Sequence, residues 1–240
     1  MKLSVCHQFK RMGYDIQMKI ASRHNWNLTP AKAVELQKQL AAEVETNDRL
    51  PATIKTVAGI DLGYDEKTQT CRAVVVVLSF PSLELMEKAE TILPIQFPYV
   101  PGLLSFREAP VAIEALEKLQ ITPDIILCDG QGLAHPRRFG IACHIGILTD
   151  IVTIGVAKSI LIGKFENLGE KRGSTAPLIH HAEQVGTVLR TRDGVQPLYI
   201  SIGHKISLPT AVDYVLRCTP KYRLPETTRL ADKFASYRKN

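Results

Sequence analysis

Residues 56–95 read TVAGIDLGYDEKTQTCRAVVVVLSFPSLELMEKAETILPI, and they contain three runs of β-forming residues in close succession. The runs cover residues 56–62, 72–80 and 85–95, separated only by a polar segment and by the Pro-Ser dipeptide at 81–82. Links of this length join antiparallel neighbours, because a parallel crossover needs a dozen or more residues. The stretch therefore predicts three antiparallel strands.

The residues that follow alternate between helical patterns and apolar strands. Apolar runs at 125–128 and 152–157 are typical of strands covered on both faces of a sheet, and a helical pattern at 138–149 lies between them. A further helix is expected at 105–119, after the third strand. This order is the ribonuclease H-like topology. The predicted fold class is α/β, a mixed sheet of three antiparallel strands and then parallel strands, flanked by helices.

Additional elements are expected on either side of this unit. Thr29 as N-cap and Pro30 at the first helical position begin a helix at 30–45. No internal repeat, low-complexity segment or linker divides the chain, so residues 26–240 are expected to form one domain. The remaining expected elements are strands at 186–190 and 198–202 around an Asp-Gly hairpin signal at 193–194, and helices at 209–217 and 227–237.

The N-terminal 25 residues are expected to be an extension outside this domain. Residues 1–17 are too polar for a secretory signal and show no clean periodicity. Met18 precedes the first convincing helix, which suggests that translation naturally starts there. An intact-mass measurement on the endogenous protein would detect Met1 or Lys2 at the terminus if that hypothesis is wrong.

The composition is that of a globular protein with a basic surface. The net charge is +6 and the sequence pI is about 9.1, so the surface should attract polyanions such as nucleic acid or anionic membrane. No apolar stretch approaches the roughly 18 to 20 residues of a membrane-spanning helix. The five cysteines are scattered and lack the paired spacing of structural zinc sites. We therefore expect a soluble, cytoplasmic protein with reduced thiols.

Two aspartates stand at matching places in the predicted sheet. Asp61 ends the first apolar run, and Asp129 directly follows the strand at 125–128. A buried carboxylate costs several kcal/mol unless it is paired, protonated or bound to a cation. If the two strands are parallel neighbours, the two acids lie side by side and repel unless a divalent ion lies between them. Either acid alone is explained as well by a role in capping a turn, but the matching positions favour a magnesium site.

Glu108 and Asp232 are two further acids whose context allows more than one role. The sequence SFRE at 105–108 fits a capping box, in which the glutamate holds the helix start, and the residues alone favour that role. In the inferred topology, however, this helix packs over the first strand and brings Glu108 near Asp61. Asp232 lies on the last expected helix, where a surface acid is the simpler interpretation.

Four motifs, in order along the chain, resemble the endonuclease V family. They are VAGID at 57–61, FPYVPGLLSFRE at 97–108, DGQGLAHPRR at 129–138 and TIGVAK at 153–158. The resemblance runs from the first expected helix to about residue 236. It implies a magnesium-dependent endonuclease that recognises deoxyinosine, hydrolyses the second phosphodiester bond 3′ to the lesion and thereby initiates DNA repair.

The resemblance also implies roles at the metal. Asp61, Glu108 and Asp129 correspond to the family's catalytic, metal-binding triad, and Asp232 matches a position that carries Asp or His beside the metal. Lys158 matches a lysine beside the active site, although the sequence alone would make it a strand-end lysine that reaches solvent. The implied cofactor is Mg²⁺, for which Mn²⁺ can substitute. Such an ion activates water and neutralises charge at the phosphate.

Residues in two of the motifs are implied to contact the DNA. Prolines stiffen the segment at 98–101 and Tyr99 offers an aromatic face, and in the family this loop acts as a wedge. Without the resemblance, the segment would be interpreted as an ordinary proline-bounded turn. The residues expected to contact the DNA or hold the flipped base are Tyr99, Pro101, Gly102, Leu104, Gly130, His135, Arg137 and Ile141.

Other functions stay open on the same fold. The scaffold could act mainly on inosine-containing RNA, because the metal chemistry does not depend on the sugar. It could also bind nucleic acid without cutting, although no acid of the triad is missing. A junction-resolving nuclease is a weaker alternative, since it leaves the segment at 98–101 unexplained. The expected partner is DNA with deoxyinosine or other damaged bases, with inosine-containing RNA as the alternative and no membrane, and the protein is expected to be a monomer.

Overall fold

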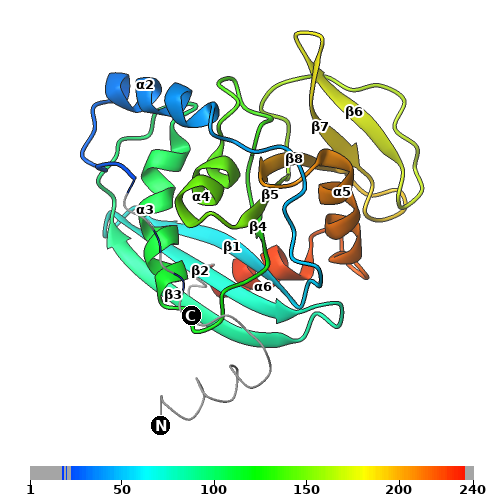
Figure 1. Cartoon of the computed structure of the whole chain (residues 1–240), viewed down its shortest axis with the longest axis horizontal. Coiled ribbons are helices and arrows are strands. Elements are labelled where there is room, and N and C mark those ends of the chain that lie inside the picture. The colour runs from blue at the N-terminus through cyan, green and yellow to red at the C-terminus, as the bar shows by residue number, and fades with distance from the viewer. Residues whose placement is uncertain (1–17, 19, 21–22, 236–240) are drawn as a thin grey trace.

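The computed structural model describes residues 18, 20 and 23–235 of the chain. Across those residues it contains an eight-stranded sheet in the order β3-β2-β1-β4-β5-β8-β7-β6, with helices against both faces (Figure 1). The strands are β1 (Thr56–Asp65), β2 (Thr70–Ser79), β3 (Leu85–Pro94), β4 (Ile125–Cys128), β5 (Val152–Ala157), β6 (Thr175–His180), β7 (Glu183–Leu189) and β8 (Leu198–His204). The helices are α2 (Pro30–Ala41), α3 (Leu104–Glu117), α4 (Ile141–Thr149), α5 (Leu208–Arg217) and α6 (Glu226–Ala235).

Strands β1 to β5 have the predicted ribonuclease H-like topology. β1 pairs antiparallel with β2, and β2 with β3, as the short links between them require. β4 and β5 join as parallel strands on the other side of β1. Beyond them, β8 pairs antiparallel with both β5 and β7, in agreement with the hairpin signal. The predicted fold class is confirmed.

The structure differs from the predicted element bounds at several places. α4 begins at Ile141 and not at residue 138, because Arg138 has φ +55°, which a right-handed helix does not allow, and the N-cap Gly140 is extended. α2 ends at Ala41, and β1 continues to Asp65 through its pairing with β2. β6 was not predicted, since Pro177 within it argues against a strand and is tolerated only because β6 is an edge. The hypothesis that translation starts at Met18 concerns residues 1–17, which lie outside the described residues. The predicted end of the last helix, residue 237, also lies outside them.

The first turns of two helices show where local sequence signals hold and where they fail. Thr29 caps α2 by accepting from a backbone N–H at 3.4 Å, and Pro30 takes the first helical position as predicted. α3, in contrast, starts after Leu103 without a side-chain cap. Ser105 lies inside that helix and pairs with His144 of α4, Oγ to Nδ1, at 3.2 Å. The predicted capping box is therefore wrong.

The helices form two layers around the sheet, with α3 and α4 on one face and α5 and α6 on the other (Figure 1). Successive strand residues point to opposite faces. Along β1, Ala58 and Ile60 belong to the core beneath α3 and α4, whereas Val57 belongs to the core beneath α5 and α6. By the same alternation, Asp61 is directed toward the layer that contains α6.

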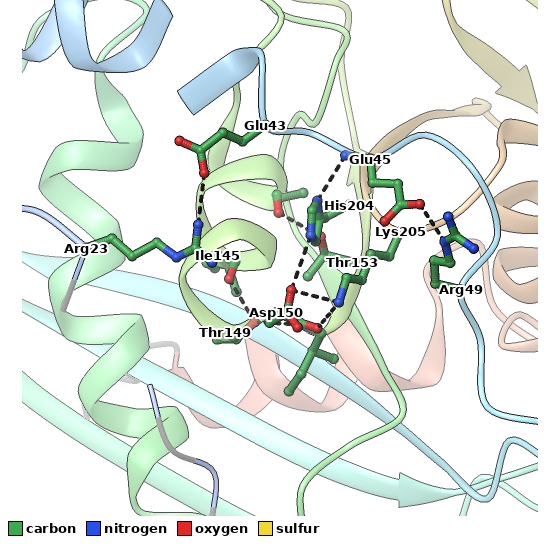
Figure 2. Close-up of polar contacts among 12 residues, drawn as sticks. Arg23, Glu43, Glu45, Arg49, Ile145, Thr149, Asp150, Thr153, His204 and Lys205 are labelled. Carbon is green, nitrogen blue, oxygen red and sulfur yellow. Dashed lines mark hydrogen bonds and ion pairs between the residues drawn. The ribbon is translucent and has the colours of Figure 1, made fainter. Parts of the chain in front are cut away.

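A polar cluster fastens the segment after α2 to the end of β8 (Figure 2). His204 Nδ1 accepts from the backbone N–H of Glu45 at 3.2 Å, and the Lys205 N–H donates to the Glu45 carbonyl at 2.7 Å. The Lys205 ammonium lies 2.7 Å from the carboxylate of Asp150, just past α4. These contacts hold α2 beside α4, so His204, which the sequence left without a role, has a structural one.

Candidate active site

Two aspartates meet where the parallel pairing of β1 and β4 ends. The register joins Ile60 to Cys128, so Asp61 and Asp129 are the next residues on neighbouring strands. The backbone N–H of Asp129 donates to the Ile60 carbonyl at 3.3 Å, which extends the pairing by one bond. Asp61 is buried, with 8% of its surface exposed. The two carboxyl groups thus lie together, largely shielded from water.

The surroundings of this pair disfavour a negative charge on Asp61. Burial raises the pKa of Asp61 to about 8, and the hydrogen bond and negative charge of Asp129 act in the same direction. The Lys158 ammonium forms an ion pair with the other side of Asp129. Burial lowers the pKa of Lys158, but the hydrogen bond and charge of Asp129 outweigh it, so the net pKa is raised. The burial that disfavours charge on Asp61 and the ion pair of Lys158 with Asp129 are therefore the main electrostatic features of this pair.

Glu108 lies in the second turn of α3, within electrostatic reach of the aspartate pair. It is 7% exposed, and the Tyr64 hydroxyl donates to its Oε1 at 2.7 Å. Burial raises the pKa of Glu108 to about 7, against the opposing hydrogen bond from Tyr64. The negative charge of Asp129 contributes to the same rise, so Glu108 lies within electrostatic reach of Asp129. Glu108 thus lies near the aspartate pair, and no side-chain cap is formed at the start of α3.

Asp232 comes from the helix layer on the other face of the sheet from Glu108. It lies on α6, which packs across β1 and β2. Its negative charge raises the pKa of both Asp61 and Lys158, which places it within electrostatic reach of each. The structure thus brings together, at one edge of the sheet, the five charged residues that the sequence singled out: Asp61, Glu108, Asp129, Lys158 and Asp232.

The residues expected at the DNA divide into an exposed and a buried set. Tyr99 is 69% exposed and Leu104 is 41% exposed, and Pro101 between them is also open to solvent. Gly130 follows Asp129 and touches Ile141, the first residue of α4; a Cβ on this glycine would lie 2.6 Å from Ile141 Cγ2. The absence of a side chain at Gly130 therefore lets Ile141 pack directly against the backbone next to Asp129.

The other three predicted DNA contacts converge on a single carbonyl group. Gly102 has φ +77°, which favours glycine, and its carbonyl accepts from Arg137 Nη2 at 2.6 Å and from Gln37 Nε2 at 3.1 Å. His135 is 5% exposed and also bonds to the Gly102 backbone; burial lowers its pKa to about 4. Arg138 instead pairs with Glu183 at 2.7 Å. The guanidinium of Arg137 thus binds the loop at 98–104 through the Gly102 carbonyl.

Comparison with known proteins identifies the family of this chain. The model of the Endonuclease V family matches residues 38–233. An Endonuclease V of Nostoc punctiforme is 59% identical over 219 residues, which cover 91% of this chain and 99% of that protein. The chain belongs to the Endonuclease V family. It is accordingly an endonuclease that acts on DNA.

Solved structures of Endonuclease V agree with the described fold. That of the Streptomyces avermitilis protein has a TM-score of 0.84 at 42% identity and covers 91% of this chain and 96% of its own. The Ciona intestinalis protein, solved with a 24mer DNA containing an inosine followed by a ribo-adenosine, has a TM-score of 0.75 at 29% identity and covers 85% of this chain and 95% of its own. None of the helices in the described part of the chain has the length and apolar character needed to span a bilayer.

The acids of this Endonuclease V family member suit a hard divalent cation by their chemistry. Their donor atoms are carboxylate oxygens, which Mg²⁺ and Mn²⁺ prefer. Within residues 18, 20 and 23–235, no three His, Cys, Asp or Glu side chains already form a coordination shell. Lys158 is paired with Asp129 in this structure. The donor set nevertheless fits the group by its chemistry, because Asp61, Glu108 and Asp129 are carboxylates within electrostatic reach of one another.

Two residues that support the site carried no clear signal in the sequence. Tyr64 holds Glu108, although nothing at its position distinguishes it from an ordinary strand tyrosine. Gln37 is fully buried and bonds to both Gly102 and Phe139. A signal for Gln37 does exist, since it is a polar residue on the buried side of α2 that otherwise contains Ala33 and Leu40. A buried amide needs partners, so its position already implied a hydrogen-bonding role.

The raised carboxyl pKa values predict that Asp61 and Glu108 contribute less to the stability of the metal-free protein as the pH rises toward 8. Asp61 titrates near 8 and Glu108 near 7 in the folded state, against about 4 in an unfolded chain, so the folded state keeps protons that the unfolded state has released. This stabilisation is complete below the unfolded pKa and is lost as the pH rises through the folded value. The free energy of unfolding should fall by about 1.4 kcal/mol per pH unit for each retained proton.

Urea unfolding in EDTA from about pH 6.5 to about pH 8 measures the effect. Histidines with lowered pKa values, such as His135 and His144, act in the opposite direction near about pH 6.5, because the unfolded chain still holds protons that the folded chain has released. The effect of Asp61 is therefore read as the difference in unfolding free energy between the wild type and Asp61→Asn, which should fall as the pH rises toward 8, and added Mg²⁺ should raise the stability of the wild type at pH 8. A difference that does not change with pH contradicts the raised pKa of Asp61.

Proposed function

We propose that this chain nicks DNA at the second phosphodiester bond 3′ to deoxyinosine, with a bound Mg²⁺ or Mn²⁺, and thereby starts the repair of deaminated adenine. The main support is that four acids lie together with Lys158 where the pairing of β1 and β4 ends. These acids are Asp61, Glu108, Asp129 and Asp232. Burial, together with the negative charge of Asp129, raises the pKa values of Asp61 and Glu108, as expected for a site built to receive a cation. The Ciona relative, solved with an inosine-containing DNA, supports the same substrate.

The acids hold the cofactor in this proposal, and they do not act as a general acid and base. Asp61, Glu108 and Asp129 supply the carboxylate oxygens, with Asp232 completing the set. The bound cation would activate a water molecule and neutralise charge that develops on the phosphate and on the leaving 3′-oxygen. Lys158, released from Asp129, has its ammonium beside the scissile phosphate and adds positive charge there.

Recognition requires the damaged base to leave the stack for inspection. Tyr99 projects from the stiff segment at 98–101, where it can fill the gap that the base leaves. The backbone of Gly102, Leu104, Gly130 and Ile141 would line the pocket for the base. Arg137 and His135 fix the Gly102 carbonyl and so shape that pocket, and they are placed to contact the neighbouring strand.

The remaining expectations concern how the protein exists in the cell. Residues 26–240 act as one domain, since the described sheet is continuous from β3 to β6. A monomer suffices, because one chain supplies every residue of the site. We place the protein in the cytoplasm, consistent with the described cysteines Cys71, Cys128, Cys143 and Cys218, which are buried free thiols.

Matched duplexes test the substrate directly. Purified protein with Mg²⁺ should nick a duplex that contains one inosine at the second bond 3′ of it, and leave the same duplex with adenine intact. EDTA should abolish nicking, and Mn²⁺ should restore it. Equal cutting of both duplexes would remove the repair function while leaving the nuclease activity in place.

A ribonuclease acting on inosine-containing RNA is the second candidate. The Ciona complex favours it, since that DNA carries a ribo-adenosine after the inosine. An RNA of the same sequence, with one inosine, separates the two functions in the same assay. A rate on RNA well above the rate on DNA would make RNA the substrate.

Tyr99→Ala should reduce nicking of the inosine duplex by about 10-fold or more, because stacking on an aromatic ring contributes about 1 to 3 kcal/mol per base. Tyr99 is 69% exposed, so the melting temperature should not change. Tyr99→Phe keeps the ring and should keep the rate. Wild-type nicking by the alanine variant would show that the ring does not assist base capture.

A further inference from the structure

Lys158 lies one residue beyond the paired part of β5. The pairing of β5 with β4 ends at Gly155, and its pairing with β8 ends at Ala157 opposite Tyr199. The sheet register that aligns the aspartates therefore does not extend to the backbone of Lys158. Its ammonium nevertheless has to reach Asp129 accurately, so other contacts must hold this backbone.

Two side chains from distant parts of the chain make those contacts. Arg223 Nη2 donates to the Lys158 carbonyl at 3.1 Å, and Gln131 Nε2 donates to the Ser159 carbonyl at 3.0 Å. Arg223 belongs to the link between α5 and α6, whereas Gln131 belongs to the loop that follows Asp129. The backbone on which Lys158 stands is thus held from both sides.

Arg223 also ties this backbone to the start of β8. Its Nε donates to the Gln196 carbonyl at 2.8 Å and its Nη2 to the Pro197 carbonyl at 2.9 Å. Its own carbonyl accepts from the hydroxyl of Thr191, which is 1% exposed, at 2.7 Å. A guanidinium is a planar fork with fixed donor directions, so it sets the distance between the segments that it joins. Hydrogen bonds from a charged donor are also stronger than neutral ones.

We propose that Arg223 is a positioning residue for Lys158, with Gln131 as its counterpart, and that the two together aim the Lys158 ammonium at the scissile phosphate. The inference rests on the role proposed above for Lys158. Neither residue touches the acids in this account; each acts through the backbone at 158–159. A misplacement of about 1 Å at a reacting group can cost about 100-fold in rate, so the effect should be measurable.

A double-mutant cycle on the nicking reaction tests this coupling. Arg223→Met should lower kcat by about 10- to 100-fold on the inosine duplex and leave KM unchanged. In a Lys158→Met background, Arg223→Met should cause almost no further loss, because the group that it positions is already gone. Gln131→Met, which keeps every Arg223 bond, should behave in the same way and serves if the Arg223 variant does not fold.

Arg172→Met is the matched control. Arg172 also donates to two backbone carbonyls, of Leu216 at 2.9 Å and Thr219 at 3.2 Å, without contacting Lys158. Its loss should lower the melting temperature about as much as the loss of Arg223 and leave kcat unchanged. Arg223→Lys keeps the charge without the fork, so it should remain impaired.

Three results would overturn the inference. If the fold-losses in kcat of the two single variants multiply in the double variant, Arg223 acts independently of Lys158. The endonuclease function then stands without the positioning role. A rise in KM with unchanged kcat, or full activity of Arg223→Lys, makes Arg223 a phosphate contact. Full activity of Lys158→Met removes the role proposed for Lys158 itself, and the inference with it.

Discussion

Asp61→Ala should slow nicking of an inosine duplex by at least about 1,000-fold while the protein stays folded. Metal-assisted charge stabilisation contributes several kcal/mol at the transition state, and about 1.4 kcal/mol corresponds to a factor of ten in rate. Asp61 is 8% exposed and its carboxyl is hydrogen-bonded to Asp129, so its removal takes a ligand from the centre of the proposed site. Single-turnover nicking with excess enzyme measures the loss of chemistry without contributions from product release.

The stability of this variant distinguishes loss of the site from loss of the fold. Charging a buried carboxyl is costly, so at pH 8, where Asp61 begins to ionise, Asp61→Ala should melt no lower than the wild type without metal. Mg²⁺ should stabilise the wild type and have little effect on the variant. Asp65→Ala is the matched control, because Asp65 lies on the same strand but accepts hydrogen bonds only within its own turn in the described contacts. A folded Asp61→Ala protein that nicks at the wild-type rate would remove Asp61 from the metal site.

The placement of the two aspartates was predictable because it depends on local patterns. The apolar runs that end at Asp61 and precede Asp129 specify two buried strands, and the short hairpins between these strands in the chain leave only one side of β1 free for β4. Once these strands are parallel, the register brings the acids together. The same reasoning placed Glu108 near the site, since the helix that carries it has to cross β1.

The supporting contacts could not be predicted in this way. Tyr64 and Glu108 are 44 residues apart, and Arg137 and Gln37 are 100 residues apart, so no periodic signal relates them. The capping box at Ser105 failed for the same reason, because the hydroxyl finds His144 of another helix in preference to its own backbone. Local sequence thus specifies which strands carry the acids, whereas tertiary packing decides which polar groups hold them.

Gly59→Ala should destabilise the protein by about 3 kcal/mol and displace α6. A Cβ at Gly59 would lie 2.3 Å from the carbonyl carbon of Thr227 and 2.6 Å from the amide nitrogen of Thr228. These are backbone atoms of the first turn of α6, so no side chain can turn aside, and the whole helix has to move. Overpacking of this kind costs about 1 to 3 kcal/mol or more. For a chain of this size, the melting temperature should fall by about 6 to 12 °C.

The displacement should also weaken the site, because α6 carries Asp232. If Asp232 helps to hold the cation, the folded fraction of Gly59→Ala will need more Mg²⁺ for half-maximal nicking than the wild type does. Gly194→Ala is the control, since a Cβ there meets nothing within 4 Å and the strain comes only from its φ of +65°. That variant should lose about 1 kcal/mol and keep the wild-type Mg²⁺ requirement. Equal Mg²⁺ requirements in the two variants would mean that the position of α6 does not matter to the metal, and Asp232 would then be a surface acid and not a ligand.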